Sequence, residues 1–392
     1  MGLQFRTYNM DSITGWNPGL PISYGVFWNA VASHYNSIED VGGRERQKSR
    51  IVHLRNFNNW IKGMLIDHYL KKVSEKKKHR EPLKVLDLAC GKGGDLLKWN
   101  QLQVTHVVGV DIAEGSIEDC KNRYNFLCSR NSKERKDHIF KGHFFAADCT
   151  KTRLRSKYDD PTTKFSIVSC QFAFHYCFES LPQAEQMLQN VSECLEPGGY
   201  FIGTLPDANT IVSRHRQAGN KKFGNEIYHI EVEDSNFSLF GAKYDFHLKG
   251  VVNCPEFLVY FPVFLRLAEK YDLVLIEKKS FPDYFNEMKD TDRGKMLLQK
   301  MSALESYPPY REKELVGEES DYEHVAKFKS LSSEDKEENP IKRIGTLTAS
   351  EWEVQIIDNY WRAMSLEGDD FTYHVIEEQI IFDQFSKMSL SC

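Results

Sequence analysis

A glycine-rich turn within residues 86–99 constrains this chain more than any other segment. The segment reads Leu-Asp-Leu-Ala-Cys-Gly-Lys-Gly-Gly-Asp-Leu-Leu-Lys-Trp, so an apolar run ends in a cluster of glycines and leads into apolar residues at helical spacing. This pattern predicts a strand, a tight turn and the start of a helix. Glycine permits positive φ and close approach to a ligand, and a helix start offers free N–H groups. The sequence therefore predicts a nucleotide-like ligand at the end of this strand.

Two common nucleotide motifs do not match this turn. A dinucleotide fingerprint requires a third glycine five residues after Gly91, where the chain has leucine, and a phosphate-binding loop requires Ser or Thr directly after Lys92. Two acids are present instead: Asp87 lies inside the strand, and Asp111 closes the next apolar run, twenty residues after Gly91. A carboxylate at that second place can accept hydrogen bonds from both hydroxyls of a ribose. The arrangement resembles the S-adenosylmethionine-dependent methyltransferases, with an ordinary ligand-free βαβ turn as the alternative.

Composition limits the classes of function. A chain of 392 residues with 41% hydrophobic residues can bury one large core or two modest ones. The net charge of −5 excludes a basic nucleic-acid coat, so any RNA contact is expected to be local. The nine cysteines form no C-x-x-C pair, which argues against zinc sites and favours a reducing compartment. No apolar run reaches the roughly 18 residues of a membrane span, and we expect neither membrane nor metal.

The order of patterns along the chain predicts an α/β protein. Residues 1–30 form a variable N-terminal arm without periodicity, and a helical segment is expected from about 44 to 78. Residues 83–205 alternate strands and helices, which predicts a doubly wound, mostly parallel, Rossmann-like sheet with ligands at the carboxyl ends of its strands. The strands are expected at 83–89, 106–111, 142–147, 165–171 and 199–204, and the helices at 94–101, 115–128 and 181–195.

The character of the chain changes after residue 205. Short alternating runs in 206–290 predict antiparallel strands, and a helix is expected from Pro255 to Tyr271, with the proline in its first turn. We interpret 206–290 as an antiparallel and helical substrate lid. Residues 312–340 are rich in Glu, Asp, Ser and Lys, which predicts an acidic mobile loop.

Beyond the glycine turn, the chain resembles the cellular mRNA cap guanine-N7 methyltransferases. Two strings carry most of the resemblance, Arg55-Asn56-Phe57-Asn58-Asn59-Trp60 and Pro255-Glu256-Phe257-Leu258-Val259-Tyr260-Phe261-Pro262. Shorter matches lie at 169–172, 175–176, 223–228, 345–347 and 351–353. The resemblance implies a cap methyltransferase domain over 31–353, with a cofactor-binding core at 83–205. It also implies RNA binding and residence in the nucleus, where caps are added to nascent transcripts.

The resemblance assigns a set of residues to the donor, S-adenosyl-L-methionine. It implies that Asp111 holds the ribose, that Asp148 lies beside the adenine and that Lys62 lies near the methionine carboxylate. The other donor-pocket positions are Ala89, Gly91, Gln171 and Tyr176. The family usually has glycine at position 89; one extra methyl group is tolerable there, but the methyl group of Ala89 would crowd the cofactor if the backbone needs positive φ.

A second set of residues is assigned to the GpppN cap. Glu256 is implied to read the N1–H and amino group of guanine, which adenine could not satisfy, and His175 is implied to lie beside the guanine. The other cap positions are Asn58, Asn59, Lys92, Lys98 and Arg123, of which the three basic residues face the nucleotides and the triphosphate. From local sequence alone, the asparagines, Lys98 and Arg123 also fit an exposed helix surface, His175 a core position and Glu256 the first turn of a helix.

The chemistry implied by the resemblance asks for alignment rather than for proton transfer. Guanine N7 has a lone pair and no proton to lose, so methyl transfer to it requires no general base. Positioning alone can supply roughly 7 to 11 kcal/mol. We therefore expect no catalytic triad.

The C-terminal segment, 354–392, is predicted to be a divergent tail. The family usually ends in an apolar strand that carries a tyrosine in contact with the cap, and here Tyr360 follows Trp352 at a longer spacing. The sequence leaves open whether that strand is preserved and what Tyr360 does. It also leaves open the oligomeric state and the presence of a small activating subunit. The alternative functions are a non-catalytic cap- or RNA-binding scaffold with a degenerate pocket and a small-molecule methyltransferase.

Overall fold

The computed structural model describes residues 45, 47–78, 81–100, 104–133, 139–310, 313–334, 343–357 and 360–366. The arm expected at 1–30 lies outside these residues. None of the described helices is long and apolar enough to cross a membrane.

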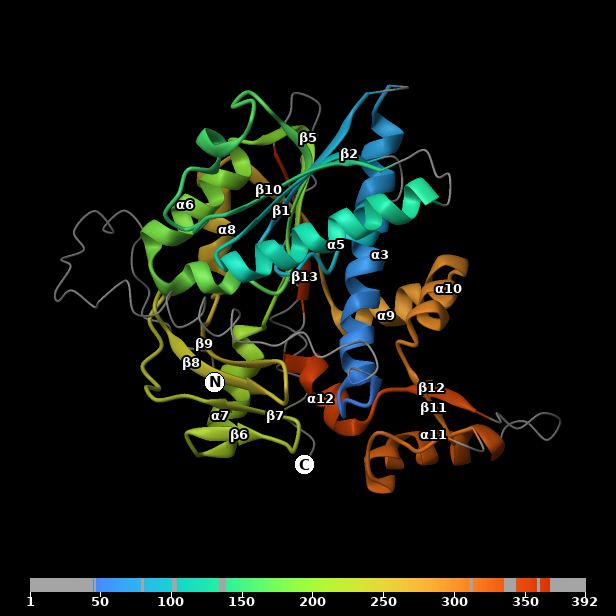
Figure 1. The fold of residues 1–392 in the computed structure, drawn as a ribbon. Helices are drawn as coiled ribbons and strands as arrows, with labels where there is room; N and C mark the ends of the chain where they lie inside the picture. The colour runs from blue at the N-terminus through green and yellow to red at the C-terminus, as the bar shows by residue number, and fades with distance from the viewer. Residues whose placement is uncertain are drawn as a thin grey trace.

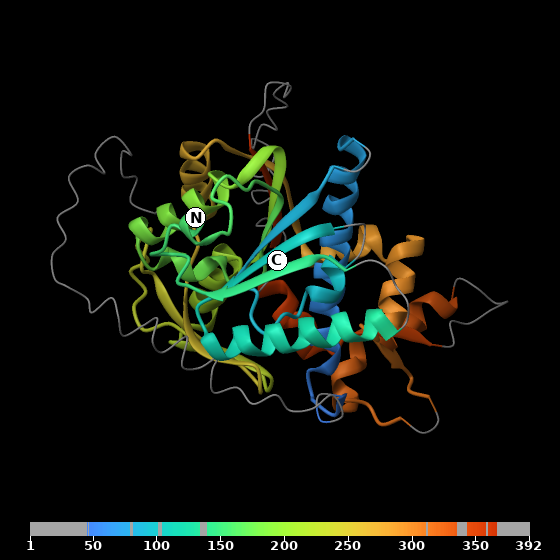
Figure 2. The same ribbon diagram turned by 45° about the horizontal axis from the view of Figure 1, so that its top comes forward.

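A seven-stranded sheet forms the centre of the molecule (Figures 1 and 2). Its order is β10-β13-β5-β4-β1-β2-β3, and neighbouring strands from β5 to β3 run parallel. The strands are β1 (Leu83–Leu88), β2 (Val104–Asp111), β3 (Lys141–Ala146), β4 (Phe165–Cys170), β5 (Leu195–Leu205), β10 (Leu273–Ser280) and β13 (Tyr360–Leu366). Strand β4 is buried along its whole length, as expected of a central strand with helices on both faces. The predicted doubly wound sheet is confirmed.

The sheet divides the core into two clusters because successive side chains of a strand point to opposite faces. Val85 of β1 joins the cluster on one face, and its neighbour Leu86 joins the cluster on the other. The first face is covered by α3 (Val52–Lys76), α4 (Leu96–Trp99), α5 (Glu114–Lys133), α9 (Phe281–Met288) and α10 (Asp292–Met301). The second is covered by the 3-10 helix η3 (Phe174–Glu179), α6 (Leu181–Ser192) and α8 (Phe261–Lys270).

Only the first part of the segment interpreted as a lid, up to Phe257, forms a separate antiparallel sheet; α8, β10 and α9 belong to the central sheet and its faces. The order of the strands in the separate sheet is β6-β7-β8-β9, with bounds Lys222–Gly224, Tyr228–Glu231, Lys243–Leu248 and Val252–Phe257. Helix α7 (Ala208–Ala218) packs against this sheet in a third apolar cluster. The helix expected from Pro255 is wrong in its start: Pro255 lies in β9, and α8 begins at Phe261. Because β9 is an edge strand, the missing N–H of proline is tolerated there.

The loop expected at 312–340 is also wrong over much of its length. Residues Glu319–Tyr322 form the 3-10 helix η4, and Glu323–Glu334 form helix α11. Although the segment is polar in composition, two of its side chains, Tyr322 and Val325, are buried and attach it to the rest of the protein. The Tyr322 hydroxyl also donates a hydrogen bond to Glu305. Glu305 belongs to a short β11 (Glu305–Tyr307), which pairs with β12 (Ile344–Thr346).

The boundary of the C-terminal tail is likewise corrected. Helix α12 (Ala349–Ile357) runs across the expected boundary at 354, and β13 follows it. Strand β13 lies between β10 and β5 and pairs antiparallel with both. Strand pairing uses backbone groups, so this segment still forms the strand between β10 and β5 although its side chains differ from the family pattern.

Candidate donor and cap sites

The carboxyl ends of the parallel strands meet at the edge of the central sheet that faces the small antiparallel sheet (Figure 1). The turns after β1, β2, β3 and β4 carry most of the donor-pocket residues named from the sequence. Helix α3, helix α12 and strand β9 bring further residues toward this edge. Parallel sheets commonly bind ligands at such an edge.

The glycine turn after β1 has the backbone that its sequence indicates. Gly91 and Gly93 have φ of 51° and 72°, and Ala89 has φ of 53°. A Cβ added at Gly91 would meet nothing within 4 Å, whereas one added at Gly93 would lie 2.8 Å from the Cys120 Sγ. Gly91 therefore borders open space, while Gly93 is required for packing. Position 89 does need positive φ, so Ala89 is strained.

Asp111 fastens this turn to the end of β2. Its Oδ2 accepts a hydrogen bond from the Gly91 N–H at 2.8 Å, and its Oδ1 accepts one from the Ala113 N–H at 2.9 Å. Burial raises the pKa of Asp111. Each carboxylate oxygen has further acceptor capacity, so the group can still receive hydroxyl donors.

Two lysines that the sequence assigned to different ligands share one carboxylate. Asp95 Oδ1 lies 3.0 Å from Lys62 Nζ and 2.6 Å from Lys98 Nζ. Burial alone would raise the pKa of Asp95, but the two lysines lower it below its ordinary value. Lys98 Nζ also donates to Asn59 Oδ1 at 3.3 Å, and burial lowers the pKa of Lys98. Lys98 is thus a buried residue rather than an exposed helix charge, and Asp95 is a site residue that sequence reasoning missed.

A second buried acid lies under the glycine turn. Asp87 accepts a hydrogen bond from Trp99 Nε1 at 2.9 Å. Burial and the nearby Asp95 raise the pKa of Asp87 to about 7. The two carboxylates therefore differ in acidity, since Asp95 is stabilised as an anion by its two lysines and Asp87 is not.

The remaining donor-pocket residues follow β3 and β4. Asp148 Oδ1 accepts from the Thr150 N–H and hydroxyl at 2.9 and 2.6 Å. Gln171 donates through Nε2 to Ser169 Oγ at 3.1 Å, and its Oε1 is buried without a partner among the described residues. This free acceptor at the strand edge fits an N–H donor of a bound ligand.

Strand β9 meets η3 through a buried polar cluster. Glu256 Oε2 accepts a hydrogen bond from the Tyr244 hydroxyl at 2.6 Å, and Glu256 Oε1 lies 3.5 Å from His175 Nε2. Tyr176 and Cys254 extend the cluster with a contact of 3.2 Å between hydroxyl and sulfur. Neither ring nitrogen of His175 has a hydrogen-bond partner among the described residues. His175 is buried, as the core interpretation expects, whereas Glu256 lies in a strand and not in the first turn of a helix; neither interpretation predicts that the two side chains meet.

Tyr244 is the residue of this cluster that sequence reasoning missed. It lies directly opposite Glu256 in the pairing of β8 with β9. The alternation of β8 marks Tyr244 as inward-facing, but only the register of the two strands shows which acid it meets.

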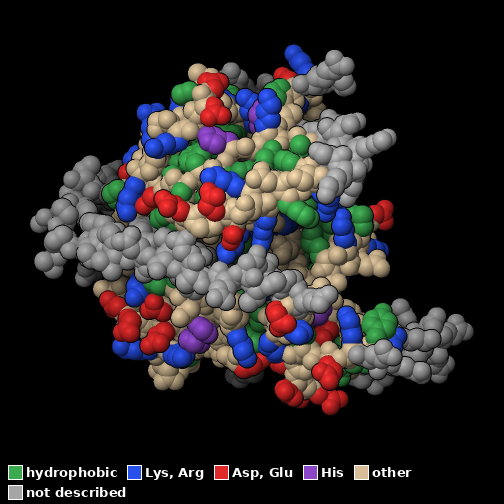
Figure 3. All heavy atoms as spheres, viewed as in Figure 1, with side chains coloured by type: hydrophobic (Ala, Val, Ile, Leu, Met, Phe, Trp, Pro, Cys, Tyr) green, Lys and Arg blue, Asp and Glu red, His purple; other side chains and the backbone are tan. Residues whose placement is uncertain are grey.

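The other cap positions are held by neighbouring elements. Asn58 Oδ1 accepts from Gln355 Nε2 at 2.8 Å, which links α3 to α12. Lys92 Nζ lies 2.8 Å from Asp119 Oδ2 on α5, and Arg123 follows one turn later on the same helix. Figure 3 shows basic and acidic side chains interspersed over the face that it draws. Basic contacts to a ligand are therefore expected to be few and local.

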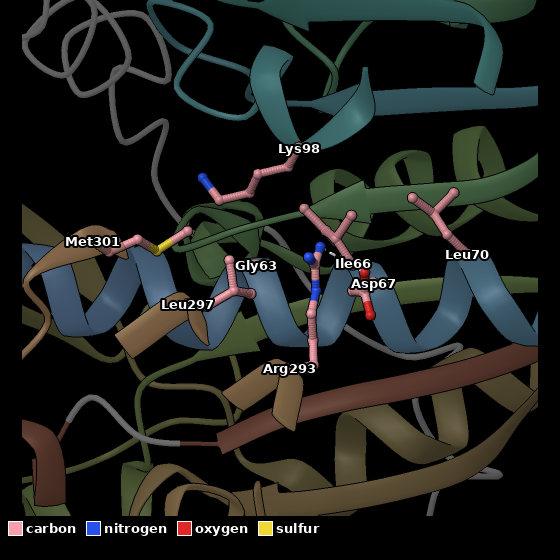
Figure 4. Close-up of a pocket in the computed structure, with 8 residues that line it drawn as sticks. All are labelled: Gly63, Ile66, Asp67, Leu70, Lys98, Arg293, Leu297 and Met301. Atoms are coloured by element: carbon pink, nitrogen blue, oxygen red, sulfur yellow. Dashed lines mark ion pairs between the residues drawn. The ribbon is translucent and has the colours of Figure 1, made fainter. Parts of the chain in front are cut away.

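A pocket of about 260 Å³, including solvent at its mouth, lies between α3 and α10 (Figure 4). Its lining is Gly63, Ile66, Asp67, Leu70, Lys98, Arg293, Leu297 and Met301. Asp67 Oδ1 pairs with Arg293 Nη2 at 2.8 Å, so the opposed charges at its wall are matched. Lys98 alone among the residues assigned from the sequence lines this pocket, which is not the expected donor or cap site.

Among the described residues, no three side chains of His, Cys, Asp or Glu gather closely enough to hold a metal ion.

Comparison with known proteins gives one consistent result. Residues 25–361 match the family described as the mRNA (guanine-N(7))-methyltransferase domain. The chain is 46% identical to the mRNA cap guanine-N(7) methyltransferase of Drosophila melanogaster, over 83% of this chain and 74% of that protein. It is 41% identical to the Caenorhabditis elegans protein of the same name, over 83% of each chain. It is 44% identical to mRNA cap guanine-N(7) methyltransferase 1 of Oryza sativa subsp. japonica, over 70% of this chain and 73% of that one.

Proposed function

Because this chain belongs to the mRNA cap guanine-N7 methyltransferase family, we propose that its residues divide the work between a donor site and an adjoining guanine site. The enzyme methylates guanine N7 of the mRNA cap and uses S-adenosylmethionine. Bound S-adenosylmethionine supplies a methyl group on a sulfonium, which is already a good leaving group. Family membership favours this activity over the scaffold and the small-molecule methyltransferase considered from the sequence.

We propose that Asp111, Gln171 and Lys62 hold the donor. The Asp111 carboxylate accepts from the ribose hydroxyls while it keeps the Gly91 N–H. The buried Gln171 Oε1 accepts an N–H of the ligand, which would satisfy an acceptor that has no partner among the described residues. Lys62 keeps its ion pair with Asp95. Because its ammonium group has three N–H donors, it can also donate to the carboxylate of the ligand. Ala89, Gly91, Asp148 and Tyr176 form the rest of the proposed pocket.

The buried cluster of Glu256, His175 and Tyr244 carries the proposal for the guanine site. The Tyr244 hydroxyl holds the Glu256 carboxylate in place by a hydrogen bond. The carboxylate oxygens of Glu256 keep lone pairs that can accept from the N1–H and the amino group of guanine. The purine becomes positively charged when N7 gains the methyl group, and a buried carboxylate favours that charge. Asn58, Asn59, Lys92, Lys98 and Arg123 are proposed to contact the nucleotides and the triphosphate.

No general base is assigned in this proposal. Guanine N7 carries no proton, so the residues of the chain bind, orient and shield the reactants instead. Such preorganised positioning is sufficient for a reaction with a strong leaving group.

The test separates the two sites by substitution. Asp111→Ala should abolish binding of S-adenosylhomocysteine, measured by calorimetry. Glu256→Gln should leave that binding near normal and lower transfer of labelled methyl onto GpppG by roughly 10- to 150-fold, the cost of losing hydrogen bonds to a charged group of about 1.5–3 kcal/mol. If Glu256→Gln lost S-adenosylhomocysteine binding and methyl transfer to the same extent, the proposed division into two sites would be contradicted. Free GTP serves as a comparison substrate that lacks the second nucleotide.

Capped RNA is the substrate, and we propose that the enzyme acts in the nucleus, where nascent transcripts receive their caps. A small activating subunit stays a prediction of the family resemblance, which co-purification from nuclear extract would test.

A further inference from the structure

We propose that Gln355 is a positioning residue that sets which end of the Asn58 amide faces the cap. This inference rests on the proposed contact of Asn58 with the cap. It concerns a residue of α12 that lies 297 positions after Asn58 in the sequence and just beyond the family match at 351–353.

The contact between the two amides has a defined direction. Gln355 donates through Nε2 to Asn58 Oδ1 at 2.8 Å. The oxygen end of Asn58 is therefore taken by the protein, and its Nδ2 has no partner among the hydrogen bonds of the described residues. The neighbouring Asn59 has the same polarity, because its Oδ1 accepts from Lys98 Nζ. Both asparagines thus present N–H donors. Such donors suit ligand atoms that accept a hydrogen bond, such as ribose or triphosphate oxygens, and do not suit a ligand N–H.

Helix α12 holds Gln355 in a fixed relation to α3. Glu351 Oε1 accepts from the Leu54 N–H at 3.0 Å, one helical turn before the Gln355–Asn58 contact on both helices. At the end of α12, the Ile357 carbonyl accepts from the Asp207 N–H at 3.0 Å, next to the carboxyl end of β5. The amide of Gln355 is therefore anchored to the same strand edge that carries the proposed sites.

Stability does not explain a glutamine at this position. Gln355 is fully buried, and its Oε1 has no partner among the described residues. A buried acceptor without a partner is unfavourable, so an apolar residue of similar size would suit the interior better. What the glutamine adds is its donor to Asn58, and we infer that this donor serves substrate binding.

The test uses Gln355→Leu in the full chain. We expect a melting temperature equal to or above that of the unsubstituted protein and unchanged binding of S-adenosylhomocysteine. The KM for GpppG should rise about 3- to 10-fold, with kcat unchanged, because one oriented hydrogen bond is lost. Gln183→Leu removes a buried glutamine of α6 that bonds to Ser180 and Glu179, and as a control for the loss of a buried amide it should leave KM unchanged. An unchanged KM in Gln355→Leu, or a lower melting temperature, would overturn the inference.

Asn58→Ala distinguishes failure of the inference from failure of the proposed function. If Asn58→Ala raises the KM and Gln355→Leu does not, only the role of Gln355 is wrong. If Asn58→Ala leaves the KM unchanged, the proposed cap contact of Asn58 is wrong and the inference falls with it. Support requires, in addition, that the double variant is no worse than Asn58→Ala alone, since Gln355 acts through Asn58.

Discussion

Two residues with left-handed backbone mark the ends of adjacent central strands. Ala89 follows β1 with φ of 53°, and Phe172 follows β4 with φ of 58°. A non-glycine residue in this region costs roughly 1–2 kcal/mol, and such strain gathers at functional sites. The Phe172 N–H donates to the Thr204 hydroxyl oxygen at 2.7 Å, so a neighbouring strand holds the strained turn in place. These turns shape the edge at which the donor is proposed to bind.

Ala89→Gly is expected to raise the free energy of unfolding by about 0.5–1 kcal/mol, because relief of the left-handed strain exceeds the added entropy of the unfolded chain. Chemical denaturation monitored by tryptophan fluorescence measures this change. Ala184→Gly, at a buried position in the first turn of α6, is the matched control, and it should lower stability by about 1 kcal/mol. A lower stability in Ala89→Gly would mean that the methyl group makes contacts worth more than the strain.

Helix α3 is the element that joins the parts of the molecule. Its buried face packs on the central sheet, its Trp60 Nε1 donates to the Gly294 carbonyl of α10 at 3.0 Å, and it carries Asn58, Asn59 and Lys62. A glycine interrupts this face at position 63, where the pocket of Figure 4 opens between α3 and α10. A Cβ added there would lie 3.3 Å from Met301 Cε and 3.8 Å from Leu297 Cδ1.

Gly63→Ala is expected to stabilise the protein by about 0.5–1 kcal/mol, through the higher helix propensity of alanine. The contact with Met301 is close, but the end of a methionine side chain adapts easily. Thermal unfolding of the variant gives the measurement, and GpppG methylation shows whether the neighbouring Lys62 is disturbed. Destabilisation would indicate that Met301 has no room to move.

At the scale of the whole molecule, the late strand β13 completes the central sheet. It lies between β5 and β10, so the order of the sheet does not follow the order of the chain. Without it, β10 would lose its pairing with the rest of the sheet, and the edge of β5 would be left open. The described part of the chain therefore depends on residues that follow the last motif of the family resemblance.

A chain that ends at Ile357 is expected to lose cooperative unfolding and to aggregate, because β10 loses its pairing and the edge of β5 is exposed, while such proteins are stable by only roughly 5–15 kcal/mol. Circular dichroism during heating and size-exclusion chromatography measure both effects. A chain that ends at Leu366 keeps all seven strands and should melt cooperatively. Cooperative melting of the shorter chain would show that β10 docks without β13.

The sequence by itself determined the fold class and pointed to the proposed donor site, because both rest on local patterns. Strand, turn and helix follow one another within 86–99, and Asp111 follows at the end of the next strand, where it bonds to Gly91. Side chains that alternate or recur at helical spacing reveal which face is buried, and this signal needs no knowledge of distant residues. The departure from the family pattern singled out position 89, but its positive φ is known only from the structure.

Only the tertiary structure decided the features that depend on distant partners. Pro255 and Glu256 belong to an edge strand because β8 pairs with them, and the polar segment that contains Tyr322 becomes ordered because Glu305 and the core receive that residue. Helix α3 brings Lys62 to the Asp95 carboxylate and Asn59 to the buried Lys98, and Gln355 meets Asn58 across 297 positions of sequence. Local sequence cannot fix these pairings, since the free energy of each contact depends on surroundings that exist only after the chain has folded.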